Sequence, residues 1–240
     1  MQPYIQQEEH QPLARLQGLS KLYKRGEVEV EALKRIDLTL NRQEFIFVIG
    51  PSGSGKTTLL NLLGCIDVPT SGQLSILGRD IVGLSDNHLA DFRNQHIGYI
   101  FQNFNLMSVL SAYENVEYPL ILNQVDRAER KERSLEMLNA VGLYHRRNHR
   151  PTQLSGGEQQ RVAIARALVK QPAMVLADEP TANLDSRTSN EIINLMLEMQ
   201  SRYKTSFIFS THDMQIMQHS DRIIRVKDGV LEMNQEGRKQ

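Results

Sequence analysis

The chain has 240 residues, and Lys plus Arg and Asp plus Glu both number 28, so the formal net charge is zero. This balance gives no overall attraction to nucleic acid or anionic lipid, and we expect no nucleic-acid partner. Hydrophobic residues make up 40% of the chain, enough for a packed core. The single cysteine, Cys65, excludes an internal disulfide and a cysteine-based zinc cluster, and we expect a buried, unreactive thiol.

The first 12 residues are polar and lack the apolar core of a signal peptide. The longest apolar runs, such as 45–49, are far shorter than the ~20 residues that cross a bilayer. We therefore expect a cytoplasmic protein, and any membrane span it works with must belong to another chain.

Three β-rich runs follow, at 14–19, 32–40 and 45–49. Apolar and polar residues alternate over 36–40, which predicts a half-exposed strand, whereas the uniformly apolar run 45–49 predicts a buried one. The buried strand leads into a glycine-rich turn and then the helical pattern 57–65. This order is typical of nucleotide-binding units.

Residues 84–150 are richer in charge and helical pattern, and 127–141 is the clearest helix. Beyond them, helices at 157–169 and 187–203 alternate with strands at 174–177 and 207–210. Such alternation predicts an α/β fold with a parallel sheet covered by helices on both faces, and a helical segment inserted in it. A final hairpin over 222–233 is expected to turn at Asp228-Gly229.

Eight residues after the buried strand match the P-loop pattern G-x-x-x-x-G-K-[ST], namely Gly50, Pro51, Ser52, Gly53, Ser54, Gly55, Lys56 and Thr57. The glycines let backbone amides converge on phosphate oxygens at a helix N-terminus. Lys56 would reach the β- and γ-phosphates, and the Thr57 hydroxyl would bind Mg²⁺. Thr58 belongs to the same expected nucleotide-binding set. A chance match in a chain this long occurs about once in a hundred sequences at average residue usage.

Two carboxylates, Asp178 and Glu179, end the apolar run 174–177. An acid at the end of a buried strand is costly unless something pairs with it. Beside a P-loop the natural partner is Mg²⁺, which makes Asp178 the expected metal ligand. Glu179 could then orient or deprotonate the attacking water. An ordinary strand end with solvated acids is the alternative, and the P-loop upstream disfavours it.

The run 154–161, Leu-Ser-Gly-Gly-Glu-Gln-Gln-Arg, places a hydroxyl and two glycines at the start of a helix. This is a second phosphate-binding arrangement, although an N-cap by Ser155 followed by flexible glycines is the plainer interpretation. The run resembles the signature of the ATP-binding cassette (ABC) ATPases. The resemblance covers nearly the whole chain.

The resemblance implies one domain over 1–240 with a RecA-like P-loop NTPase core. An N-terminal antiparallel β subdomain and an α-helical subdomain at about 84–165 complete it. Two cassettes of this family meet head to tail, with each ATP between the P-loop of one and the signature helix of the other. The signature residues implied in this contact are Ser155, Gly156, Gly157 and Glu158, the last standing where many members have glutamine.

The remaining site residues also come from the resemblance. Tyr23 matches the aromatic that stacks on adenine, with a strand aromatic in a small core as the alternative. Gln102 matches the glutamine that joins the Mg²⁺ shell to the helical subdomain, and Asp185 lies in the loop that crosses the dimer interface. His212 matches the histidine at the γ-phosphate. Catalytic roles thus fall to Lys56, Gln102, Glu179 and His212, and Mg²⁺ ligation to Thr57, Gln102 and Asp178.

The segments 50–64, 100–106, 114–116 and 176–185 resemble the subgroup of lipoprotein-releasing (LolD), macrolide-exporting (MacB) and cell-division (FtsE) ATPases, and the resemblance is greatest to its LolD and MacB side. This implies an ATP- and Mg²⁺-dependent homodimer on the cytoplasmic face of the inner membrane. It would drive a separate integral membrane permease subunit, and Phe104, Leu106 and Met107 would border the groove that receives this partner. A cell-division signalling subunit, or an ABC protein without a membrane partner, is the alternative.

Overall fold

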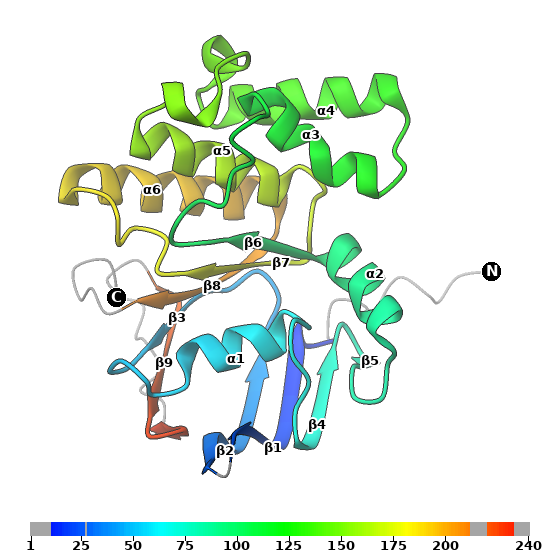
Figure 1. Cartoon of the computed structure of the whole chain (residues 1–240), viewed down its shortest axis with the longest axis vertical. Coiled ribbons are helices and arrows are strands. Elements are labelled where there is room, and N and C mark those ends of the chain that lie inside the picture. The colour runs from blue at the N-terminus through cyan, green and yellow to red at the C-terminus, as the bar shows by residue number, and fades with distance from the viewer. Residues whose placement is uncertain (1–10, 27, 212–219, 233–240) are drawn as a thin grey trace.

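The computed structural model in Figure 1 describes residues 11–26, 28–211 and 220–232. Its strands form two sheets. The first is an antiparallel sheet of order β2-β1-β4-β5, made of β1 (Ala14–Arg25), β2 (Val28–Leu40), β4 (Ser71–Ile76) and β5 (Arg79–Asp80).

The second sheet has the order β10-β9-β3-β8-β7-β6 and is parallel except for β10. Its strands are β3 (Phe45–Ile49), β6 (Ile97–Ile100), β7 (Met174–Asp178), β8 (Ser206–Thr211), β9 (Arg222–Lys227) and β10 (Val230–Glu232). The expected α/β fold class is thereby confirmed.

Helices cover the parallel sheet on one side and, together with the antiparallel sheet, on the other (Figure 1). They are α1 (Lys56–Leu63), α2 (Asp86–His96), α3 (Ala112–Leu122), α4 (Arg127–Ala140), α5 (Gly156–Leu168) and α6 (Ser186–Tyr203), with short 3₁₀ turns at Tyr144–Arg146 and Pro151–Gln153. No helix in the described ranges is long and apolar enough to cross a bilayer.

The central strand β3 divides the core into two layers. Every residue of β3 is buried, and alternate side chains point to opposite faces. Phe45 and Phe47 pack with helices α3 to α6, whereas Ile46 and Val48 pack with α1 and the antiparallel sheet. The loop after β3 is therefore anchored by a strand that cannot shift without opening both layers.

The helical segment leaves the core sheet after β6. Strand β6 pairs in parallel with β7, so that Ile100 lies opposite Ala177. The range 84–165 expected for the inserted subdomain therefore includes a strand of the core. Helices α3, α4 and α5 pack against one another on the face away from α1.

Candidate nucleotide-binding site

The expected catalytic residues follow neighbouring strands at one edge of the parallel sheet. β3, β8, β7 and β6 are adjacent and parallel, and the P-loop follows β3. Asp178 ends β7 and lies in register with Ser210 on β8, while Gln102 comes two residues after β6. Ligands of open parallel sheets bind at this carboxyl edge.

The P-loop curls so that the N-terminus of α1 faces outward without a cap. Gly55 precedes the helix at φ 111°, and a Cβ there would lie 2.6 Å from the carbonyl oxygen of Ala32. Within the described part of the chain no side chain accepts from the first-turn amides of α1. These unsatisfied N–H groups and the helix dipole suit a phosphate.

Lys56 lies folded back over the loop that it follows. Its ammonium donates to the carbonyl oxygens of Gly50, at 2.8 Å, and Pro51, at 2.9 Å, and the residue is only 8% exposed. The positive charge is therefore held at the mouth of the loop, where a phosphate chain would lie.

Thr57 and Asp178 form an oxygen pair beneath the loop. The Thr57 hydroxyl lies 3.2 Å from Oδ2 and 3.5 Å from Oδ1 of Asp178, which also accepts from the Ser210 hydroxyl. In the described ranges no group of three His, Cys, Asp or Glu could hold a metal. A hydroxyl and a carboxylate nevertheless fit Mg²⁺, which takes few protein ligands and completes its shell with phosphate and water.

Glu179 adopts a strained backbone conformation directly after this pair. Its φ is 46°, a left-handed value that costs a non-glycine residue about 1–3 kcal/mol. The Glu179 amide donates to both the carbonyl and the hydroxyl oxygen of Ser210, each at 3.1 Å. Ser210 thus holds both acids, and the sequence interpretation missed it. A polar residue opposite Asp178 in a fully buried strand is the signal that could have found it.

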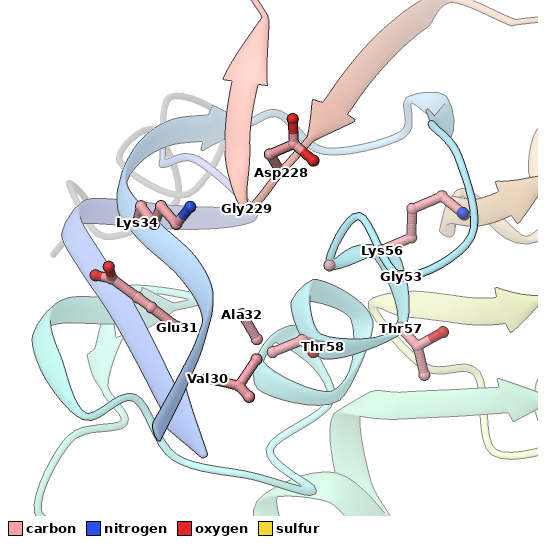
Figure 2. Close-up of a pocket in the computed structure, with 11 residues that line it drawn as sticks. Val30, Glu31, Ala32, Lys34, Gly53, Lys56, Thr57, Thr58, Asp228 and Gly229 are labelled. Carbon is pink, nitrogen blue, oxygen red and sulfur yellow. The ribbon is translucent and has the colours of Figure 1, made fainter. Parts of the chain in front are cut away.

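A cavity of about 320 Å³ lies beside the P-loop (Figure 2). Strand β2 forms one wall through residues such as Val30, and the turn Asp228-Gly229 forms another. This turn is tied in place, because the Gly229 amide donates to the carbonyl oxygen of Ser54 (3.0 Å) and its carbonyl accepts from the Lys34 amide (2.7 Å). The hairpin was expected from the Asp-Gly pair, but its place at the cavity was not.

The other P-loop residues differ in how far they are exposed. Gly53 and Thr58 line the cavity, whereas Ser52 is exposed at the tip of the loop. Ser54 is buried, and its hydroxyl has no hydrogen-bond partner in the described part of the chain.

Tyr23 does not itself line this cavity, although its strand partner Val30 does, and its hydroxyl is hydrogen-bonded. It pairs with Val30 across β1 and β2, and its side chain is 37% exposed. The hydroxyl donates to Asp67 Oδ2 at 2.7 Å, and the Lys21 ammonium lies 4.9 Å from the ring centroid. Partial burial, followed by the hydrogen bond to Asp67, raises the pKa of Tyr23. The hydrogen bond thus fixes the orientation of the ring, and the raised pKa keeps the Tyr23 hydroxyl protonated.

The signature residues lie outside the cavity of their own chain. Ser155 caps α5 and forms a reciprocal capping box with Glu158, whose carboxylate also pairs with Arg146 at 3.0 Å. The amide of Ser155 is the main cause of the lowered pKa of Glu158. Gly156 and Gly157 lie in the first turn behind the cap. None of these four residues lines the cavity.

Three expected site residues remain. The backbone oxygen of Gln102 accepts from the Asn183 side chain at 3.0 Å, and the Gln102 side chain is exposed. Asp185 caps α6 by accepting from the amide and hydroxyl of Thr188, and these hydrogen bonds lower its pKa. His212 lies outside the described residues.

A parallel sheet whose first strand leads through a glycine loop into a helix, with a threonine hydroxyl against the carboxylate of a nearby strand, defines a P-loop nucleoside triphosphatase. A family model described as ABC transporter matches residues 33–182. The chain belongs to this ABC transporter family, to which ATP binding and hydrolysis are general.

The similar proteins agree with this assignment. The chain is 47% identical to the uncharacterized ABC transporter ATP-binding protein YvrO of Bacillus subtilis, over 92% of this chain and 96% of that protein. It is 46% identical to the macrolide export ATP-binding/permease protein MacB 2 of Yersinia pestis bv. Antiqua, over 90% of this chain but only 32% of that protein. The dimeric post-hydrolysis structure of the cassette MJ0796 with ADP and Pi superposes with a TM-score of 0.86 at 42% identity. That match covers 95% of this chain and 100% of that one.

Proposed function

We propose that this chain hydrolyses ATP with Mg²⁺ and drives a separate membrane permease that exports or extracts its substrate. The observation that carries the proposal is the Thr57–Asp178 pair, 3.2 Å apart beneath the P-loop, with Glu179 as the next residue. The similarity of the chain to the macrolide-export ATP-binding/permease proteins supports a transport role.

The phosphates would lie at the N-terminus of α1, where free amides and the Lys56 ammonium stabilise negative charge. Thr57 and Asp178 would hold Mg²⁺, with Gln102 at the next strand end. When bound, the ion neutralises charge that develops on the β- and γ-phosphates. Tyr23 and Val30 would present an apolar face to the adenine ring.

Glu179 would accept a proton from the attacking water or orient it. The two hydrogen bonds from its amide to Ser210 fix the backbone from which the carboxylate projects. His212, expected at the γ-phosphate, is the next residue in the sequence after β8 and lies outside the described residues.

A second copy of the chain would complete each site. Residues 155–158 line no part of their own cavity, yet Ser155 presents a helix N-terminus of the kind that binds anions. In a head-to-tail dimer this end would face the γ-phosphate held by the other subunit, and Asp185 would lie in the loop at the interface. The dimeric state of the similar MJ0796 cassette supports this assembly.

The permease would dock on the cytoplasmic face of the inner membrane, through a groove beside Gln102. A cavity of about 210 Å³ opens there between β6, α3 and α5. The Arg166 guanidinium donates to the carbonyl oxygens of Phe104 and Asn105 and so fixes the segment after Gln102. Met107, 36% exposed, adds an apolar contact, whereas Leu106 packs against the core.

The test is a pull-down of tagged Glu179→Gln protein with ATP and Mg²⁺ from detergent-solubilised membranes of the native host, read by mass spectrometry. We expect ATP-dependent recovery of an integral membrane protein. The same bait without nucleotide and a Lys56→Ala bait are the controls. Recovery of soluble proteins or nucleic acid alone would contradict the membrane role while leaving the nucleotide site untouched.

A further inference from the structure

A buried glutamine outside the expected site holds the backbone next to Glu179. Gln160 lies on α5 and has no exposed surface, and its amide nitrogen donates to the carbonyl oxygen of Pro180 at 2.6 Å. Pro180 directly follows Glu179. The strained Glu179 backbone is thus held on one side by Ser210 and on the other by Gln160.

The amide oxygen of the same side chain, in contrast, lies in an unfavourable environment. Oε1 of Gln160 is buried and has no hydrogen-bond partner in the residues that the structure describes. Buried polar atoms are nearly always paired, and an apolar side chain of the same size would avoid this unfavourable oxygen. The feature that only glutamine supplies here is the donated hydrogen bond to Pro180.

Helix α5 also packs closely along the segment that follows Pro180. A Cβ on Gly157 would lie 2.7 Å from the methyl group of Thr188, so only glycine permits this approach of α5 to α6. Arg161 extends the contact through an ion pair with Glu191 at 3.7 Å. Helix α5 is therefore held both against the Pro180 carbonyl and against helix α6, which follows the loop that carries Glu179.

We infer that Gln160 is a positioning residue that connects the two half-sites of one chain. It ties the helix that bears Ser155 to the backbone of Glu179. The inference rests on the proposed function, in which Ser155 serves the ATP of the second subunit and Glu179 serves the chain's own ATP. Closure of one ATP site then positions Glu179, the proposed base, in the other ATP site.

The test substitutes Gln160→Met, which keeps the size of the side chain and removes the donor. The matched control is Thr205→Val, because Thr205 is also buried and donates its hydroxyl to a proline carbonyl, that of Pro172, at 2.8 Å. Full-length proteins are compared for kcat, the Hill coefficient for ATP, ATP affinity, ATP-dependent dimerisation and thermal midpoint.

We expect kcat of Gln160→Met to fall by about tenfold to a hundredfold, as for a catalytic group displaced by ~1 Å. The Hill coefficient should fall toward one. ATP affinity should stay within about twofold, because a group acting only in the transition state leaves ground-state binding unchanged. The Thr205→Val protein should retain wild-type kcat.

Two results would overturn the inference. One is a Gln160→Met kcat equal to that of Thr205→Val. The other is a loss of kcat matched by equal losses of ATP affinity and thermal midpoint, which indicates a general structural role. Normal turnover by Glu179→Gln, in contrast, would overturn the proposed base itself.

Discussion

The hydroxyl of Thr57 lies 3.2 Å from Oδ2 of Asp178, although 121 positions separate the two residues. The parallel sheet creates this proximity, because β3 and β7 flank β8 and all three end at the same edge. Ser210 of β8 donates to Asp178 and completes the link. The topology of the sheet therefore brings the two oxygens together.

Replacing Lys56 with alanine should remove most of the affinity for ATP. Lys56 is the cation at the mouth of the loop, and a hydrogen bond to a charged group contributes about 1.5–3 kcal/mol, so the dissociation constant should rise about 10- to 100-fold. Isothermal titration calorimetry measures this change. The control is Lys131→Ala, an exposed lysine on α4, and equal affinities of the two variants would contradict the P-loop assignment.

The Glu179→Gln variant should bind ATP but hardly turn it over. Loss of a general base slows reactions by about 10²- to 10⁴-fold, and the amide keeps the size of the side chain. ATP should then accumulate in a closed homodimer, visible by size-exclusion chromatography with light scattering. Glu198→Gln, an exposed glutamate on α6, is the control. Wild-type turnover by Glu179→Gln would exclude Glu179 as the base.

The sequence predicts best the features that neighbouring residues determine. The P-loop is contiguous and lies between an apolar strand and a helix, so its chemistry can be read without tertiary structure. The helices expected at 157–169 and 187–203 agree within one residue with α5 (Gly156–Leu168) and α6 (Ser186–Tyr203). Both begin at a side-chain cap, Ser155 or Asp185, which marks a helix start in the sequence itself.

Elements with a broken local pattern were not predicted. Strand β1 runs to Arg25, beyond the expected 14–19, because register shifts after Leu16 interrupt its alternation of apolar and polar residues. Helix α3 contains Pro119, a helix-breaking signal that tertiary packing overrides. Helix α2 and the short strands β4 and β5 were likewise not located.

Contacts between distant residues were beyond reach from the sequence. Ser210, Gln160 and Gly229 support the site through hydrogen bonds to backbone groups far away in the chain. Tyr23 depends on Asp67, 44 positions later, for its orientation. No periodicity encodes such pairs, since they arise only once the elements of the fold have packed together.

Ser155→Arg should leave ATP binding by the single chain nearly intact and abolish ATP-driven dimerisation. The bulky cation would project from the signature helix into the partner's nucleotide. Loss of the Ser155 N-cap itself destabilises helix α5 by only about 1 kcal/mol. Ser111→Arg is a matched control, because Ser111 caps α3 with the same capping box, through Glu114. Analytical ultracentrifugation with ATP distinguishes the variants, and a normal Ser155→Arg dimer would contradict the head-to-tail arrangement.

Glu158→Gln should reduce the sensitivity of the fold to acid while leaving turnover at pH 7 nearly unchanged. The Ser155 amide and Arg146 lower the pKa of Glu158 in the folded chain. A lowered pKa stabilises the fold above the unfolded value, about 4.5, and this stabilisation is lost as the pH falls through the folded value. At pH 7 the substitution should cost under about 1 kcal/mol, because the ion pair is partly exposed.

Urea denaturation at pH 7 and pH 3 measures this difference. Wild type and the control Glu132→Gln, an exposed glutamate on α4, should lose more stability between the two pH values than Glu158→Gln does. Equal losses in all three proteins would mean that the Glu158 carboxylate contributes nothing to the cap. Turnover should stay within about twofold, since the carboxylate binds its own helix and Arg146, so glutamine can replace it without loss of a transition-state contact.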